Sequence, residues 1–197
     1  MISRLKGILV TRDPEAIEVE TDGGVVYWLE VPLTVLERLP SAGNPVELRT
    51  VQVVTETSVA LYGFIDAHER ALFQRLLTAS GVGPKLALSM MSAYRADRLA
   101  RALVEKDLVA LQQVSGVGRK KAEKLVLELA EKVADLAVAM PGVAAAPGGA
   151  GAQEAVRALV ALGFSFSDAD HAVRQALEDG ASGASADEII RKALSGR

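Results

Sequence analysis

The sequence predicts an α+β protein built from several small domains. Three observations point to this class. Short alternating strand patterns fill residues 1–63, helical spacing takes over from Asp66, and an uncharged stretch rich in Ala, Gly and Pro precedes a last group of helical segments. The 197 residues suffice for two or three such domains, and half of them are apolar, so a packed core is expected and global disorder is excluded.

Residues 1–63 form the first predicted domain, a five-stranded β-barrel of the OB-fold type. Asp22-Gly23-Gly24 separates two alternating stretches, which is a hairpin signal. Leu33, Leu36 and Leu39 recur at a three-residue step and predict a short helix between the third and fourth strands. A small β-barrel that binds no ligand fits these residues equally well. The aromatic side chains expected in the barrel core or at a subunit contact are Tyr27, Trp28 and Tyr62.

Residues 64–140 form the second predicted domain, which is all-helical. Asp97 and Asp107 are expected to cap two of its inner helices. The last helix is predicted to run without a break from Arg119 to about Met140, with one buried face. That face is formed by Ala122, Leu125, Val126, Leu129 and Val133.

A flexible linker is predicted over residues 141–150, because such small, uncharged residues cannot bury enough surface to become ordered. A loop packed on the body is the alternative. Residues 151–197 carry three helical patterns and predict a small three-helix bundle. Its size and its Leu162-Gly163-Phe164 turn resemble ubiquitin-associated (UBA) domains. Its expected core is Val156, Leu159, Val160, Leu162, Phe164, Val173, Leu177, Ile189, Ile190 and Leu194.

One short phrase occurs twice in the helical domain. Residues 80–87 read Ser-Gly-Val-Gly-Pro-Lys-Leu-Ala and residues 115–122 read Ser-Gly-Val-Gly-Arg-Lys-Lys-Ala, so six of eight residues recur 35 positions later. Glycine tolerates a positive φ and lets another backbone come close. A helix that begins directly behind the glycines presents free N–H groups and the positive end of its dipole, which suits a bound anion. We interpret each copy as a turn between helices that holds a backbone phosphate.

Other interpretations of the glycine turns fit less well. A nucleotide-binding P-loop needs a preceding strand and a Gly-Lys-Ser/Thr ending, which neither copy has. A dinucleotide fingerprint needs a third Gly or Ala where Leu86 stands, and its context is a strand rather than a helix. A purely structural helix–turn–helix explains one copy, but two copies in the same basic segment favour phosphate binding.

The net charge of −3 conceals an uneven distribution. Residues 1–63 hold 5 Lys and Arg against 9 Asp and Glu, residues 64–140 hold 12 against 9, and residues 141–197 hold 5 against 7. The segment with both glycine turns is therefore the basic one, which favours contact with nucleic acid there.

Composition excludes several kinds of site. The absence of cysteine excludes disulfides, zinc–thiolate sites and thiol nucleophiles. No apolar run approaches the roughly 20 residues of a membrane span, and Met1 leads into a strand pattern, so neither membrane insertion nor a signal peptide is expected. His68 and His171 are isolated and are interpreted as ordinary surface or helix-cap residues. No catalytic residue, metal ligand or cofactor is predicted.

The two turns resemble the helix-hairpin-helix motif, here as a tandem pair. Such a pair binds duplex DNA through phosphates, one motif on each strand across the minor groove, which implies little base readout and strong salt dependence. The residues that would make these contacts are Gly81, Val82, Gly83, Lys85, Gly116, Val117, Gly118, Arg119, Lys120 and Lys121.

The order of barrel, tandem hairpins, linker and three-helix bundle resembles the RuvA family over nearly the whole chain. The most specific stretches are residues 1–7, 61–64, 81–87, 116–123 and 158–164. The resemblance implies a non-catalytic scaffold for Holliday junctions, with four duplex arms held open and flat on a tetramer that can pair into an octamer. It also implies a role in homologous recombination and DNA repair in the bacterial cytoplasm.

Protein partners follow from the same resemblance. The C-terminal bundle would recruit RuvB, a hexameric AAA+ ATPase that drives branch migration, and the RuvC resolvase is a further expected partner. The chain itself would be an accessory subunit without an ATPase site. The residues expected to contact the motor are Leu162, Gly163, Phe164, Leu177, Ile190 and Leu194.

The turn before the last barrel strand departs from the family pattern. It usually reads Arg-Glu-Asp, and its two acids form a pin at the junction centre. This chain reads Thr55-Glu56-Thr57-Ser58, so Glu56 keeps its charge and Thr57 has none. Less repulsion of phosphates from the centre is expected to weaken the discrimination between open junctions and plain duplex. On these residues alone, a plain polar hairpin tip is the favoured interpretation of Glu56, and only the resemblance favours the pin.

Three alternative functions stay open at this stage. A general duplex-binding helix-hairpin-helix adaptor would lack junction selectivity. A helix-hairpin-helix glycosylase or nuclease would need a nucleophilic Lys, an activating Asp or clustered carboxylates, and the sequence singles out none of these. A protein-interaction adaptor that uses only the C-terminal bundle would leave the twin turns unexplained.

Overall fold

The computed structural model describes residues 1–14, 16–139, 149–164, 166–177 and 185–195. The chain divides into two compact units, Met1–Val133 and Ala134–Arg197. The predicted linker, residues 141–150, lies outside the described residues up to position 148. Its last two positions are helical, so the linker prediction is wrong there.

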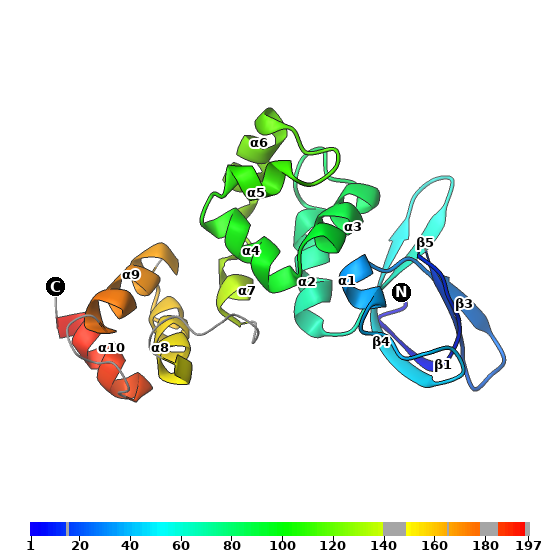
Figure 1. The fold of residues 1–197 in the computed structure, drawn as a ribbon, viewed down its shortest axis with the longest axis horizontal. Coiled ribbons are helices and arrows are strands. Elements are labelled where there is room, and N and C mark those ends of the chain that lie inside the picture. The colour runs from blue at the N-terminus through cyan, green and yellow to red at the C-terminus, as the bar shows by residue number, and fades with distance from the viewer. Residues whose placement is uncertain (15, 140–148, 165, 178–184, 196–197) are drawn as a thin grey trace. The chain divides into compact units, whose positions relative to one another are not determined.

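The first unit opens with a curled antiparallel sheet (Figure 1). Its strands are β1 (Arg4–Arg12), β2 (Ile17–Glu20), β3 (Val26–Leu29), β4 (Pro45–Val54) and β5 (Val59–Phe64). They pair in the order β3-β2-β1-β4-β5. Glu30, just after β3, closes the curl on β5, because its N–H donates to the Leu61 carbonyl and its carbonyl accepts from the Gly63 N–H, both at 2.9 Å. With α1 (Leu33–Leu36) between β3 and β4, the predicted OB-like barrel is confirmed.

Alternation along the strands separates the barrel interior from its outer surface. On β1, Leu5 and Leu9 are buried, whereas Ile8 between them is exposed. Gly7 is required by a close approach of two strands, because a Cβ there would lie 2.0 Å from the Glu20 carbonyl oxygen of β2.

The aromatic residues of the barrel divide between its two faces. Tyr62 is buried, and Tyr27 is half-buried. Trp28 on β3 is 55% exposed. Of the two places expected for Trp28, the barrel core is therefore wrong, because the alternation along β3 turns Leu29 inward and Trp28 outward; a subunit contact stays a prediction.

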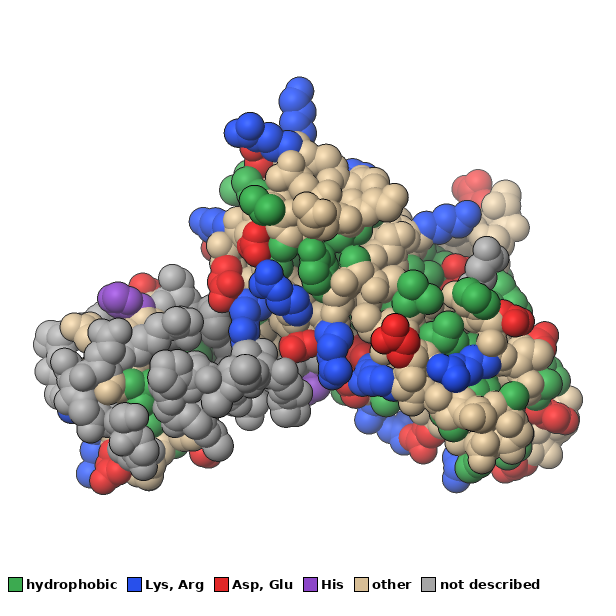
Figure 2. All heavy atoms as spheres, viewed as in Figure 1, with side chains coloured by type: hydrophobic (Ala, Val, Ile, Leu, Met, Phe, Trp, Pro, Cys, Tyr) green, Lys and Arg blue, Asp and Glu red, His purple; other side chains and the backbone are tan. Residues whose placement is uncertain are grey.

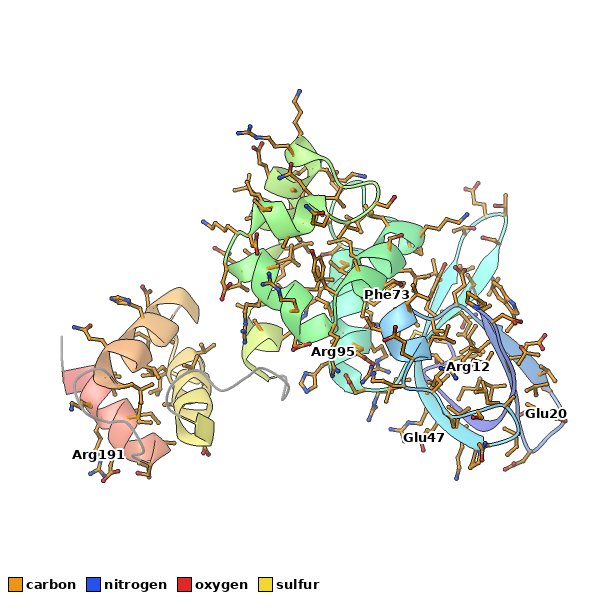
Figure 3. All side chains as sticks on the ribbon, viewed as in Figure 1. Arg12, Glu20, Glu47, Phe73, Arg95 and Arg191 are labelled. Atoms are coloured by element: carbon orange, nitrogen blue, oxygen red, sulfur yellow. The ribbon has the colours of Figure 1, made fainter. Side chains whose placement is uncertain are left out.

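Helices complete the first unit and share a core with the barrel. They are α2 (Ala67–Leu76), α3 (Pro84–Ala93), α4 (Ala96–Val104), α5 (Leu108–Gln112) and α6 (Arg119–Leu129). Phe73 of α2 packs on β5, with its ring centroid 4.9 Å from that of Tyr62 and 5.0 Å from that of Phe64 (Figure 3). This aromatic contact holds α2 against the sheet.

Glu69 joins the start of α2 to the barrel. Its carboxylate accepts from the N–H groups of Ile65 (3.0 Å) and Asp66 (3.2 Å), and the Asp66 side chain accepts from the Glu69 N–H (2.8 Å), which makes a capping box. The same carboxylate pairs with Arg38, which follows α1. Burial raises the pKa of Glu69, and the neighbouring Asp66 adds to the rise while Arg38 opposes it.

The two predicted helix caps have different outcomes. Asp107 caps α5 as predicted, since its carboxylate accepts from the Ala110 N–H at 2.9 Å. This bond is the main cause of the lowered pKa of Asp107. The predicted cap at Asp97 is wrong, because α4 begins at Ala96 and places Asp97 in its first turn, where it pairs with Arg95 at 3.8 Å.

The single long helix predicted from Arg119 to about Met140 is also wrong. Helix α6 ends at Leu129, and a turn over residues 130–133 follows it. Within that turn the Lys132 carbonyl accepts a hydrogen bond from Arg75 of α2 at 2.6 Å. This tertiary bond accompanies the break, although the Val133 N–H still donates to the Leu129 carbonyl at 3.0 Å. The predicted buried face still holds, because all five of its apolar residues are buried.

All secondary-structure elements in the described part of the second unit are helices. Its helices are α7 (Ala134–Ala139), α8 (Gly149–Ala161), α9 (Phe166–Ala176) and α10 (Ala186–Ser195). The last three enclose a core formed by Ala155, Val156, Leu159, Ala169, Val173, Ala176 and Ile189. Leu162 and Leu194, predicted as core, are 65% and 43% exposed, because each lies at the end of its helix. Among the described helices, none has the length and apolar character needed to cross a membrane.

Candidate nucleic-acid interface

The first glycine turn joins α2 to α3. Gly81 has a φ of +79°, in the left-handed region that favours glycine. Val82 is buried, and its N–H donates to the Ala79 carbonyl at 3.1 Å, which anchors the turn in the core. Gly83 is the N-cap of α3, with φ −90° and ψ 173°, and Pro84 is the first helical residue. The turn therefore ends where α3 begins.

The second glycine turn repeats this geometry between α5 and α6. Gly116 has a φ of +84°. Val117 is buried, and its N–H donates to the Val114 carbonyl at 3.0 Å. Gly118 is the N-cap of α6, with φ −84° and ψ 173°, and Arg119 is the first helical residue. The repeated sequence thus folds into a repeated backbone.

Gly83 and Gly118 are not required by the internal packing of the chain. Both have negative φ values that any residue adopts, and a Cβ added at either would meet no other heavy atom within 4 Å. At Gly7 and Gly63, by contrast, an added Cβ would meet atoms of the chain at 2.0 and 3.1 Å. The open space at both N-caps suits the close approach of another molecule.

Both helix starts leave N–H groups for an external acceptor. Neither Gly83 nor Gly118 has a side chain that could cap the helix. The first helical bonds run from the Ala87 N–H to the Gly83 carbonyl (3.0 Å) and from the Ala122 N–H to the Gly118 carbonyl (2.9 Å). The N–H groups ahead of these bonds have no helical partner, and the dipole favours an anion beside them.

Basic side chains flank both helix starts. Lys85 is the second residue of α3, Lys120 is the second residue of α6, and both are exposed. Arg119 pairs with Glu123 across one turn of α6 at 3.0 Å, but its side chain is 81% exposed. Lys121 is half-buried. Figure 2 shows Lys and Arg side chains standing out from the part of the unit where α6 lies.

The sequence prediction missed a contact between the two hairpins. The Glu128 carboxylate of α6 accepts from the Ser80 N–H at 2.7 Å, and the Lys124 ammonium donates to the Ser80 hydroxyl at 2.8 Å. Lys124 and Glu128 also pair with each other at 3.7 Å. The available signal was weak: Lys124 follows Lys120 by one helical turn, and Ser80 belongs to the repeated phrase.

Glu56 and Thr57 lie at the tip of the β4–β5 hairpin, which projects from the sheet (Figure 1). The tip is closed by the Thr55 N–H, which donates to the Ser58 carbonyl at 2.8 Å. The residues at 56 and 57 are both exposed. The carboxylate of Glu56 is therefore presented to solvent, and nothing in the described fold uses it.

The six residues predicted to contact a motor differ in exposure. Leu162, Gly163 and Leu194 are exposed, and Gly163 has a φ of +96°. The other three, Phe164, Leu177 and Ile190, are half-buried against the core of the second unit. A small cavity of about 120 Å³ brings Phe164 and Leu194 together, with Asp168, His171 and Lys192 also in its lining. Within the described ranges, no group of three or more His, Asp or Glu side chains could hold a metal ion.

The fold and its two turns define a tandem helix-hairpin-helix protein with an N-terminal barrel. Residues 73–131 match a family model described as a SAM-like helix-hairpin-helix tandem. Residues 1–63 match the RuvA N terminal domain, and residues 150–196 match the RuvA C-terminal domain. The chain belongs to the RuvA family.

Relatives from several bacteria resemble the chain over most of its length. A protein of Gemmatimonas aurantiaca is 48% identical over 170 residues, which cover 86% of this chain and 85% of that protein. A protein of Pseudomonas aeruginosa strain PAO1 is 43% identical over 86% of this chain and 87% of its own. A protein of Acidobacterium capsulatum is 40% identical over 83% and 82%. Each is described as Holliday junction branch migration complex subunit RuvA.

Proposed function

We propose that this chain is a non-catalytic DNA-binding scaffold of a branch-migration complex in the bacterial cytoplasm. It binds four-way junctions through backbone phosphates and holds them open and flat as a homotetramer. It recruits the RuvB ATPase, which supplies the motion, and the RuvC resolvase acts on the same junction. The names of its relatives support the junction and the complex; the phosphate contacts are inferred from the turns.

The open space at Gly83 and Gly118 carries this proposal. Each glycine stands at a helix start, has an ordinary φ and faces no atom of its own chain. A phosphate oxygen can therefore reach the free N–H groups of α3 and α6 without a clash. Lys85 and Lys120, one residue further on, add charge-assisted contacts. Two such sites in one compact unit fit two strands of one duplex.

The phosphate contacts are tested by removing one cation at a time. In Lys85→Ala or Lys120→Ala, the logarithm of junction affinity should fall less steeply with the logarithm of salt concentration, by about one unit per lost contact. Arg191→Ala in α10 (Figure 3) is the control, since it removes an exposed cation from the other unit. A salt slope unchanged in both lysine variants would refute the hairpin assignment.

Junction selectivity is the finer part of the proposal. Gel-shift titrations should give much tighter binding to a four-way junction than to duplex of equal length under excess competitor duplex. Equal affinity would favour the alternative, a general duplex-binding adaptor. The mass of the protein alone and with a junction, measured by native mass spectrometry, tests the tetramer.

The β4–β5 tip is proposed as the junction-centre pin. Four subunits would bring four copies of Glu56 together, and repulsion from phosphates would keep the arms apart. Thr57 supplies no second charge, and this single feature favours weaker discrimination. Thr57→Asp should raise the ratio of junction to duplex affinity, and Glu56→Gln should lower it. A ratio that neither change moves would remove the tip from the mechanism.

A further inference from the structure

We propose that Glu128 and Lys124 are positioning residues that hold the two phosphate-binding turns at a fixed separation. This inference rests on the proposed function of the turns. It gives a role in that function to two residues outside the repeated sequence. Both residues lie in α6, the helix whose start forms the second turn, yet both contact Ser80 at the first turn.

Glu128 and Lys124 contact both the backbone and the side chain of Ser80. The Glu128 carboxylate accepts from the Ser80 N–H (2.7 Å), the Lys124 ammonium donates to the Ser80 hydroxyl (2.8 Å), and the two charged groups pair at 3.7 Å. Ser80 directly precedes Gly81, the residue with positive φ. These contacts therefore restrain the backbone of the turn itself. Charge-assisted hydrogen bonds are short and directional, which suits them to hold a backbone in place.

A second contact lies one helical turn further along the chain. The Lys132 ammonium donates to the Thr78 hydroxyl at 3.1 Å, and the Lys132 carbonyl accepts from Arg75 at 2.6 Å. The segment that leads into the first glycine turn is therefore bonded to α6 and to the turn over residues 130–133 that follows α6. Because α6 is a continuous helix from Arg119 to Leu129, its start moves with these contacts.

The direction in which DNA affinity changes distinguishes a positioning role for Glu128 from a purely electrostatic effect of its charge. A carboxylate near two phosphate sites repels DNA, so removing it should tighten binding. If Glu128 positions the first turn, its removal should weaken binding despite the lost repulsion. Glu123 is the matched control, because it lies on the same helix, pairs with Arg119 and has no described contact with the first hairpin.

The test compares Glu128→Ala, Glu128→Gln and Glu123→Ala in the full-length chain, with junction affinity measured at several salt concentrations. We expect Glu128→Ala to weaken binding about fivefold, the order expected for one partly exposed charge-assisted contact. Glu128→Gln keeps an oxygen for the Ser80 N–H and should restore most of the affinity. Glu123→Ala should bind more tightly than the wild type. Unfolding in urea identifies any variant that merely fails to fold.

The outcomes separate this inference from the proposed function. If Glu128→Ala binds as tightly as Glu123→Ala or more so, the positioning role is wrong, even if Lys85→Ala and Lys120→Ala weaken binding. If Glu128→Gln binds no better than Glu128→Ala, the Ser80 N–H contact is not the cause. If the lysine variants bind like the wild type, the proposed function fails first. A folded Glu128→Ala that binds weakly, with rescue by Gln, supports the inference.

Discussion

The four glycines of the two turns serve two different purposes. Gly81 and Gly116 have φ values of +79° and +84°, so their role is conformational. Gly83 and Gly118 have ordinary φ values and face open space, so the conformation of the chain does not explain them. The sequence has glycine at all four positions, but the two roles differ and can be tested separately.

Substitution by alanine should separate stability from DNA binding at these positions. Gly81→Ala should lower the free energy of unfolding by about 1 kcal/mol or more, because alanine is strained at positive φ. Gly83→Ala and Gly118→Ala should cost less, about 0.5 kcal/mol, since a Cβ meets nothing there and the remaining cost is that alanine is a poorer N-cap than glycine. They should nevertheless weaken junction binding, because the methyl group would stand where the proposed phosphate contact lies. Urea unfolding and gel shifts check the two effects; unchanged binding in both would count against close phosphate approach.

At the residue scale, the sequence predicted the turns well because their geometry is local. Gly81 and Gly116 adopt the left-handed conformation that only glycine favours, and Gly83 and Gly118 stand where the next helix begins. Lys124 and Glu128 could not be predicted in the same way. Their role depends on how α6 packs beside Ser80, which is 44 and 48 positions away. No local pattern encodes that distance.

At the element scale, α2 is fixed to the barrel by a polar and an apolar contact. Phe73 stacks against β5, and Glu69 accepts from the backbone before α2 while pairing with Arg38 after α1. Arg38 lies in the barrel part of the chain and Glu69 in the helical part. The ion pair therefore links these two parts.

The Glu69 site makes a specific prediction about pH. Its folded pKa is raised above the ordinary 4.5, so the folded state favours the protonated form, and ionisation costs stability. Relative to Glu69→Gln, the wild type should therefore gain stability as pH falls from about 7 toward about 4.5, and lose it as pH rises. Urea unfolding at several pH values measures the difference. The opposite trend would show that the attraction of Arg38 exceeds the cost of burial.

Element boundaries were harder to predict than element types. The strands, α1 and the helical segments follow from hydrophobic periodicity, and Asp107 caps α5 as its local sequence indicates. The break after Leu129 has no glycine or proline to signal it, and a hydrogen bond from Arg75 to Lys132 accompanies it. Such a bond forms only once the end of α2 lies beside the turn that follows α6.

At the scale of the whole molecule, the division of the chain suggests a division of labour. The barrel and both glycine turns lie in the unit Met1–Val133. The cavity lined by Phe164 and Leu194 lies in the other unit. We therefore expect junction binding and motor recruitment to be separable by truncation.

A chain that ends at residue 148 tests this separation. It lacks α8, α9 and α10 and retains every residue of the two turns. It should bind junctions with the affinity and salt slope of the full chain, and it should not stimulate branch migration by the ATPase partner. A matched full-length variant, Leu194→Asp, should lose stimulation while keeping its binding. Loss of junction binding in the truncated chain would contradict the proposed division.

Trp28 gives the molecule a built-in optical reporter. It is the single tryptophan of the sequence, and it is 55% exposed on the outer surface of β3. An indole in water emits at longer wavelength than one covered by protein. The emission wavelength of Trp28 therefore depends on what covers the outer surface of β3. Trp28 lies outside both glycine turns. A subunit contact is one of the two places expected for Trp28. If a neighbouring subunit covers this residue in the proposed tetramer, its emission should shift to longer wavelength when dilution separates the subunits, without any label attached to the protein.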